Sequence, residues 1–162
     1  SAGMTIQYAF GLVKKQSPTK RNENYTTVTF EEDVVRFKND SAEMSIGSKA
    51  FLAEVATFLS ENSYLWESVI ISGHTSLVGE EDYNKYLSYK RANAVFQVFK
   101  EMGVPQGKIN IEGLGESKPK HLVEKNKEQA YENRRVELKF VKMRNDKEFK
   151  RFIEILKKKH KK

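Results

Sequence analysis

The side chains best suited to recognition chemistry are concentrated in residues 73–91, directly after an apolar run at residues 68–72. The apolar run predicts a buried strand, and Gly73 and Gly79 predict the turns that lead from it into a helix. The helix is expected to carry four of these side chains on one side: Tyr83, Asn84, Leu87 and Arg91. Polar groups at the end of a strand and along the next helix are typical of a binding site on an α/β scaffold.

No catalytic constellation accompanies these residues. Ser88 has no evident histidine and aspartate partners, and the acidic residues 80–82 suit the positive end of a helix dipole. The three histidines lack the spacing of metal ligands, and the chain contains no cysteine, which removes disulfides and cysteine nucleophiles. We therefore expect a binding module without enzymatic activity, cofactor or metal.

The composition predicts one folded domain without a membrane span. The chain has 162 residues, of which 38% are hydrophobic and 11% aromatic, enough to form a core. No apolar run is long enough to cross a bilayer, and no signal peptide is visible at the N-terminus. We interpret residues 1–24 as a lead-in and linker from a longer protein, and we expect any membrane attachment to come from a missing N-terminal anchor.

The net charge of +7 belongs mainly to the C-terminal end. Residues 143–162 carry nine basic and three acidic side chains, which leaves about +1 for the preceding 142 residues. A nucleic-acid-binding domain would carry its positive charge on the folded body, so we expect no nucleic-acid partner. The basic end is predicted to be a solvated helix terminus, with contact to anionic polymers or lipid head groups as the alternative.

Hydrophobic periodicity predicts alternating strands and helices along the rest of the chain. Strands are expected at 25–37 with an acidic interruption at 31–33, and at 66–72, 108–113 and 134–141. Helices are expected from Ser45 to about residue 60, through residues 81–102, briefly at 128–132, and from Asn145 or Asp146 onward. This order predicts an α/β (α+β) two-layer sandwich with a mixed four-stranded sheet, in which residues 25–142 form the domain and residues 143–162 an extra C-terminal helix.

Five sequence blocks, in this order, resemble one family. The blocks are Val35-x-Phe37-x-x-Asp40-Ser41-Ala42-Glu43-Met44, Gly73-His74-Thr75, Tyr83-Asn84-x-x-Leu87-Ser88-x-x-Arg91-Ala92, Gly113-x-Gly115-Glu116-x-x-Pro119 and Asn133-Arg134-Arg135-Val136-Glu137. Together they resemble the OmpA-like peptidoglycan-binding domain, which occurs in major outer-membrane proteins, peptidoglycan-associated lipoproteins and stator B subunits. The resemblance covers roughly residues 26–142 and implies a periplasmic, cell-envelope location and non-covalent binding of peptidoglycan stem peptides.

The resemblance also implies a ligand contact that this chain has changed. In the family, an aspartate just after the Gly-His-Thr block and the arginine of the Leu-Ser-x-x-Arg-Ala block hold the zwitterionic end of diaminopimelate. The arginine is matched by Arg91, whereas Ser76 stands at the aspartate position. Loss of one charge-assisted bond costs on the order of 1–3 kcal/mol. Glu80, Glu81 or Asp82 could substitute if the loop folds back.

We expect the remaining site residues to surround these two. Asn84 lies seven residues before Arg91, roughly 10 Å by helix rise, and Leu87 between them could form the pocket floor. Of the two adjacent arginines before the last strand, one is expected to pair internally, and Arg135 is taken as the site-lining one. The predicted ligand-binding residues are therefore Phe37, Thr75, Ser76, Tyr83, Asn84, Leu87, Arg91 and Arg135.

Two functions of different classes fit these observations. The first is an anchor that binds peptidoglycan, either as part of a stator-type homodimer or in a lipoprotein or barrel-linked protein. The second is a structural or protein-interaction module that has kept the fold and lost or altered the ligand, which the serine at position 76 motivates.

Overall fold

A computed structural model describes residues 24–161, so the predicted lead-in lies outside the described residues except for Asn24. The elements are β1 (Tyr25–Glu31), α2 (Ile46–Glu61), β2 (Ser68–His74), α3 (Glu81–Glu101), β3 (Ile109–Gly115), α4 (Lys127–Asn133), β4 (Arg135–Val141) and α5 (Asp146–His160). Within residues 24–161, none of the helices has the length and apolar character needed to cross a membrane.

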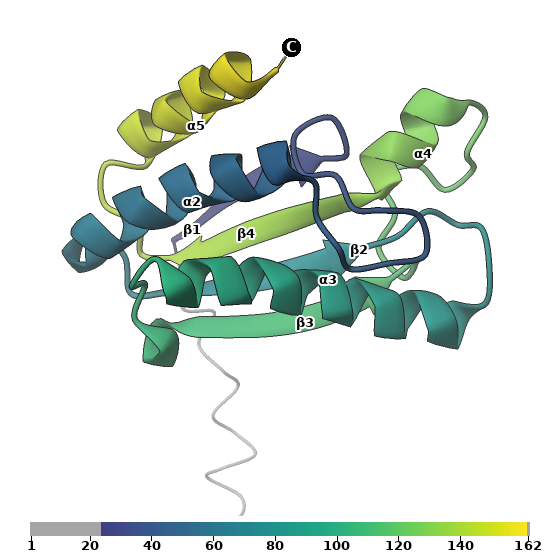
Figure 1. The fold of residues 1–162 in the computed structure, drawn as a ribbon, viewed down its shortest axis with the longest axis horizontal. Helices are drawn as coiled ribbons and strands as arrows, with labels where there is room; N and C mark the ends of the chain where they lie inside the picture. The colour runs from purple at the N-terminus through teal and green to yellow at the C-terminus, as the bar shows by residue number, and fades with distance from the viewer. Residues whose placement is uncertain (1–23, 162) are drawn as a thin grey trace, which may run out of the picture.

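The four strands form one mixed sheet in the order β1-β4-β2-β3. The β4 strand pairs antiparallel with both β1 and β2, while β2 and β3 are parallel. Helices α2, α3 and α5 cover one face of this sheet, and α4 lies at one end of it (Figure 1). The predicted two-layer α/β sandwich with an extra C-terminal helix is confirmed.

Alternation along the strands separates a core face from an open face. In β4, Val136, Leu138 and Phe140 are buried, whereas Glu137 and Lys139 between them are only half-buried. Since side chains alternate across a strand, the apolar set faces the helices and the charged set faces away from them. The β2 strand has the predicted inner position, between β4 and β3, but only one of its faces is covered by helices.

The core is aromatic where α5 joins it. The Phe140 and Phe149 rings pack edge to face with their centroids 5.1 Å apart, and the centroids of Trp66 and Phe140 are 5.8 Å apart. Ile153 and Leu156 of α5 are buried in the same cluster. The basic C-terminal helix is therefore held by its apolar stripe, as the periodicity predicted.

Helix α3 lies directly on β2 and β3 because two glycines leave room for it. A Cβ atom at Gly73 would clash with the Ser88 carbonyl oxygen, and one at Gly113 would clash with the Tyr89 backbone nitrogen. The prediction that Gly73 forms a turn is wrong, since it lies inside β2 and pairs with Gly113. Only Gly79 makes the predicted turn, with a φ of 103°.

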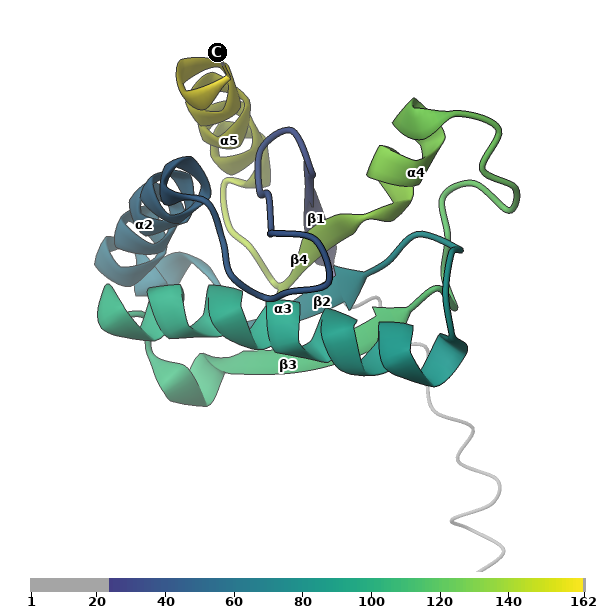
Figure 2. The same ribbon diagram turned by 45° about the vertical axis from the view of Figure 1, so that its right-hand side comes forward.

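The predicted continuation of the first strand through residues 34–37 is also wrong. The β1 strand ends at Glu31, whose carbonyl accepts hydrogen bonds from the Val34 and Val35 backbone, each at 3.0 Å. Beyond this turn, residues 32–45 form a loop with a single bridge between Phe37 and Met44. Figure 2 shows the loop passing close to α3 before it enters α2.

The predicted helix starts are confirmed, with one difference in how they are capped. The Ser45 hydroxyl accepts a hydrogen bond from the Ser48 backbone at 3.2 Å and so caps α2. Asn145 lies at the start of α5 in a left-handed conformation, with a φ of 54°, and its side chain makes no capping hydrogen bond.

Candidate ligand-binding site

A polar cavity of about 420 Å³ lies beside the first half of α3. Its other walls come from the loop of residues 32–45, the loop of residues 75–80, the loop of residues 116–126, and α4 with the residue that follows it. The volume suits the end of a peptide or a small polar ligand. Six of the eight predicted site residues line it: Phe37, Thr75, Ser76, Asn84, Leu87 and Arg91.

The wall formed by α3 is rigid at Asn84 and Leu87. Asn84 is 5% exposed, and its amide nitrogen donates to the Val78 carbonyl at 3.0 Å, which ties the 75–80 loop to the helix. The amide oxygen accepts no hydrogen bond from residues 24–161, so it is available to a ligand donor. Leu87 is 7% exposed one turn further on and gives the cavity an apolar patch.

Arg91 is held by the loop that crosses α3. Its Nε donates to the Ser41 carbonyl at 2.9 Å, and its guanidinium lies 5.1 Å from the centre of the Phe37 ring. Partial burial lowers the pKa of Arg91 below its ordinary value, although a guanidinium stays charged at neutral pH. Its Nη2 also donates to the Lys38 carbonyl, at the longer distance of 3.4 Å. Nη1 and the second hydrogen of Nη2 remain for a ligand carboxylate, which a guanidinium can bind through two parallel hydrogen bonds.

The carboxylates that reach the cavity differ from those expected. Glu80, Glu81 and Asp82 are exposed and do not line it, because α3 begins at Glu81 and its first turn faces solvent. The acidic residues in its wall are Glu32, Asp40 and Glu124.

Glu124 contacts the loop that contains Ser76. Its Oε1 accepts hydrogen bonds from the Leu77 backbone and from the Asn133 amide nitrogen, both at 2.9 Å. Ser76 itself is 8% exposed and lines the cavity with an uncharged hydroxyl. The negative charge near position 76 therefore comes from a different part of the chain.

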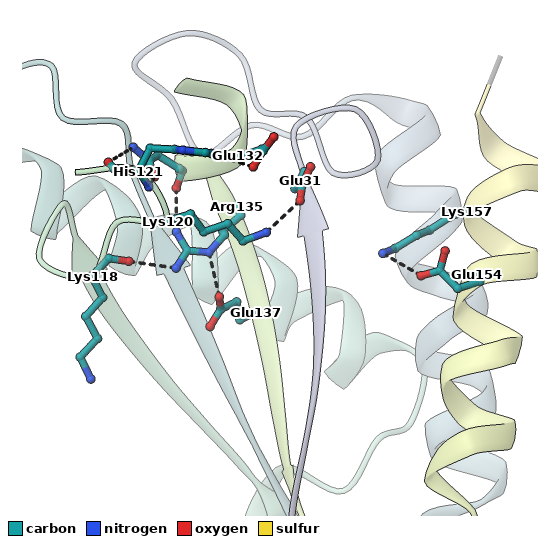
Figure 3. A network of polar contacts seen from close by, with 10 residues as sticks. Glu31, Lys118, Lys120, His121, Glu132, Arg135, Glu137, Glu154 and Lys157 are labelled. Carbon is teal, nitrogen blue, oxygen red and sulfur yellow. Dashed lines mark hydrogen bonds and ion pairs between the residues drawn. The ribbon is translucent and has the colours of Figure 1, made fainter. Parts of the chain in front are cut away.

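Both adjacent arginines pair with a glutamate, and Arg134, not the predicted Arg135, lines the 420 Å³ cavity. Arg135 is 7% exposed and does not line the 420 Å³ cavity. Its Nε donates to Glu137 Oε1 at 2.8 Å and its Nη2 to the Lys118 carbonyl at 2.9 Å, and Figure 3 shows the guanidinium directed at these two partners. Arg134 lines the cavity instead, with its Nε 2.6 Å from Glu32 Oε2.

A much smaller void of about 20 Å³ adjoins the cavity, and His74 and Arg135 line it. His74 is buried, and its Nε2 lies 3.5 Å from Glu137 Oε2, a distance too long for a strong hydrogen bond. His74 and then Arg135 nevertheless hold the pKa of Glu137 at about 2, against partial burial that acts in the opposite direction. This charge network, in which Glu137 is half-buried, lies below the cavity at the small void that His74 and Arg135 line.

The Thr75 hydroxyl in the cavity wall is buried without a hydrogen-bond partner among residues 24–161, whereas Ser88 and Tyr83 contribute no polar group to the cavity. Ser88 donates to the Lys85 carbonyl at 2.8 Å and accepts from the Gly115 backbone at 2.9 Å, so its hydroxyl links α3 to β3. Tyr83 is 43% exposed and does not line the cavity. In the described part of the chain, no group of three or more histidine, aspartate and glutamate side chains is placed to hold a metal ion.

The sequence analysis assigned no site role to several residues that line the cavity: Glu32, Asn39, Asp40, Glu124, Tyr131 and Arg134. Arg134 and Asp40 were present in the recognised blocks, so a signal existed for them. Glu124 lies in a loop without periodicity, and no sequence pattern distinguishes it from its neighbours.

The fold and the cavity together define an α/β module with a polar site beside the first half of α3. The family model described as the OmpA family matches residues 36–135, and the chain belongs to this family. The chain is 39% identical over 104 residues to the outer-membrane lipoprotein YfiB of Pseudomonas aeruginosa, a match that covers 63% of this chain and 59% of that protein. The chain therefore spans little more than half the length of this relative.

Solved structures agree with this assignment. The peptidoglycan-associated lipoprotein from Burkholderia pseudomallei has a TM-score of 0.58 at 27% identity, over 71% of this chain and 89% of that one. The periplasmic domain of Helicobacter pylori MotB reaches a TM-score of 0.65 over 86% of this chain and 96% of that one, at 17% identity, which shows a shared fold. The predicted localisation in the cell envelope and periplasm is confirmed by membership of the OmpA family and by the likeness to the two lipoproteins.

Proposed function

We propose that this chain binds the peptide stems of cell-wall peptidoglycan non-covalently and thereby anchors an envelope protein to the wall. The observation that carries the proposal is the oriented guanidinium of Arg91 in a 420 Å³ cavity whose walls also carry carboxylates. A stem peptide ends in amino-acid chemistry, with carboxylate and ammonium groups close together. A cavity that contains both charges matches such a zwitterion.

The proposed contacts follow from the donors and acceptors that remain available. The ligand carboxylate binds the guanidinium of Arg91, and Asn84 offers its amide oxygen to a ligand donor. Leu87 contacts the aliphatic part of the side chain. Membership of the OmpA family and the likeness to a peptidoglycan-associated lipoprotein support this assignment.

The protein that carries this anchor is proposed to be one of three kinds: a stator-type subunit, a lipoprotein or a barrel-linked protein. The stator reading predicts a homodimer and rests on the trailing helix α5 and the lead-in before β1. Analytical ultracentrifugation distinguishes it, because a stator-type chain is expected to sediment as a dimer at high concentration. A monomer at all concentrations would contradict the dimer for this chain.

A second candidate is a structural or protein-interaction module that no longer binds the wall. Ser76 favours it, because a buried hydroxyl stands where the family carries an aspartate. The fold and the α3 packing would then be retained without ligand affinity. The two candidates differ in one measurable property, namely retention on purified peptidoglycan.

Pull-down with purified sacculi tests the proposal. We expect the wild-type chain to sediment with sacculi and Arg91→Ala to remain in the supernatant. Lys90→Ala is the matched control, because it removes the same charge from the neighbouring residue, which is exposed and does not line the cavity. Retention of Lys90→Ala with loss of Arg91→Ala supports the anchor, whereas no retention of wild type overturns it in favour of the second candidate.

A further inference from the structure

We infer that Glu124 supplies the negative charge that position 76 lacks, and that its carboxylate binds the ammonium group of the ligand. The inference rests on the proposed binding of a zwitterionic stem-peptide end. It assigns a ligand contact to the loop between β3 and α4, a part of the cavity wall for which no sequence pattern predicted a role. It also explains how a chain with Ser76 can retain affinity for such a ligand.

Hydrogen bonds hold the Glu124 carboxylate against the loop that contains Ser76. Its Oε1 accepts one hydrogen bond from the Leu77 backbone, the residue after Ser76, and one from the buried Asn133 amide. Asn133 is in turn fixed by the His121 backbone, which donates to its Oδ1 at 2.9 Å and accepts from its Nδ2 at 3.0 Å. The side chain therefore has little freedom, and the charge is positioned before a ligand arrives.

The second oxygen of Glu124 remains available for a ligand. No hydrogen bond or ion pair involves its Oε2 among residues 24–161, and no basic side chain pairs with this carboxylate in that part of the chain. A carboxylate has about four acceptor sites, and only two are used here. An ammonium group that enters the cavity can therefore form a charge-assisted hydrogen bond without displacing an existing partner.

The other two cavity carboxylates are less suited to this role. Glu32 is already paired with Arg134 at 2.6 Å. Asp40 is exposed and precedes Ser41, whose carbonyl holds Arg91. An ammonium bound at Asp40 would lie on the wall that holds the guanidinium and would be repelled by it. Glu124, on the loop bonded to Leu77, provides a negative site on a separate wall.

A bracing role for Glu124 must be separated from a charge role, because the same oxygen joins two loops. Glu124→Gln makes this separation, since a glutamine keeps a carbonyl oxygen for both hydrogen bonds and loses only the charge. Glu128→Gln is the matched control, because Glu128 is an exposed acid in the first turn of α4 and does not line the cavity.

The test is calorimetric titration with a stem tripeptide that ends in meso-diaminopimelate, beside the same peptide with its side-chain ammonium acetylated. We expect Glu124→Gln to weaken binding of the free-ammonium peptide at least tenfold and Glu128→Gln to leave it within twofold. The double variant Ser76→Asp with Glu124→Gln is expected to regain most of the lost affinity, because it restores a charge at the neighbouring position. Acetylation is expected to weaken wild-type binding and to abolish the difference between wild type and Glu124→Gln.

Three results would overturn the inference. If wild type and Glu124→Gln bind the free peptide with equal affinity, Glu124 does not contact the ammonium group, and the proposed function stands. An equal loss for the free and acetylated peptides would show that the substitution acts through loop structure. Absence of wild-type binding to the free peptide would overturn both the inference and the proposed function.

Discussion

The two halves of α3 differ in what they contact, although they form one continuous helix. Residues from Ala92 to Phe99 bury apolar side chains against the sheet and α2, and Phe99 is fully inaccessible. Residues from Asn84 to Arg91 instead face a polar cavity. The site half therefore buries few large apolar side chains, and it is positioned by the core half and by close backbone contact with the glycines beneath it.

The largest expected effect is on the core half. Phe99→Ala removes a buried aromatic ring and leaves a cavity, which is expected to lower the free energy of unfolding by about 3–5 kcal/mol. Denaturant unfolding measures it, with exposed Gln97→Ala as the control. The affinity of the folded Phe99→Ala protein for the stem peptide should change little. A loss of affinity as large as that of Arg91→Ala would show that the two halves are not separable.

A substitution in the sheet beneath the site half should affect both stability and ligand binding. Gly73→Ala places a Cβ against the Ser88 backbone, which cannot move without displacing α3 from the sheet. We expect a loss of about 1–3 kcal/mol in unfolding free energy together with weaker ligand binding. Gly107→Ala is the control, because its added Cβ has no neighbour within 4 Å. Normal affinity in a destabilised Gly73→Ala would contradict the positioning role of this contact.

The smallest effect should come from the charge network below the cavity, and it should depend on pH. The pKa of Glu137 is about 2 in the folded protein, below its value of roughly 4.3 in an unfolded chain. A lowered pKa stabilises the fold at pH values above the unfolded value, and that stabilisation is lost as pH falls toward 2.

Glu137→Gln is therefore expected to be about 1–2 kcal/mol less stable than wild type at pH 7, after allowance for the partly exposed side chain. The difference should shrink between pH 5 and pH 2. Thermal melts across this range measure it, with the exposed Glu101→Gln as a control. A difference that is constant over the whole range would mean that the glutamate acts through packing and not through charge.

Local patterns predicted the fold because each element carries its own periodic signal. The Ser45 cap, the apolar stripe of α5 and the alternation of β4 needed no knowledge of tertiary contacts. The family blocks then predicted most of the cavity residues on α3 and at the end of β2. What failed were features that depend on contacts between distant segments.

The adjacent arginines illustrate the limit. Neighbouring residues at a strand start point to opposite sides, so either Arg134 or Arg135 could have faced the cavity. Only the surrounding structure shows that Arg135 is used by Glu137 and that Arg134 reaches the site. The glycines under α3 and the Glu124 contact depend in the same way on backbone approach and loop placement, which have no sequence period.

The central claim is that the cavity beside the first half of α3 binds the stem-peptide end. The most direct test is an NMR titration of the isotope-labelled chain with the diaminopimelate-containing tripeptide. We expect amide shifts confined to residues 75–80, 84–91 and the loop near Glu124, and we expect them to disappear in Arg91→Ala. Shifts centred on the basic end of α5 or on the outer face of α3, or no shifts at millimolar peptide, would contradict it.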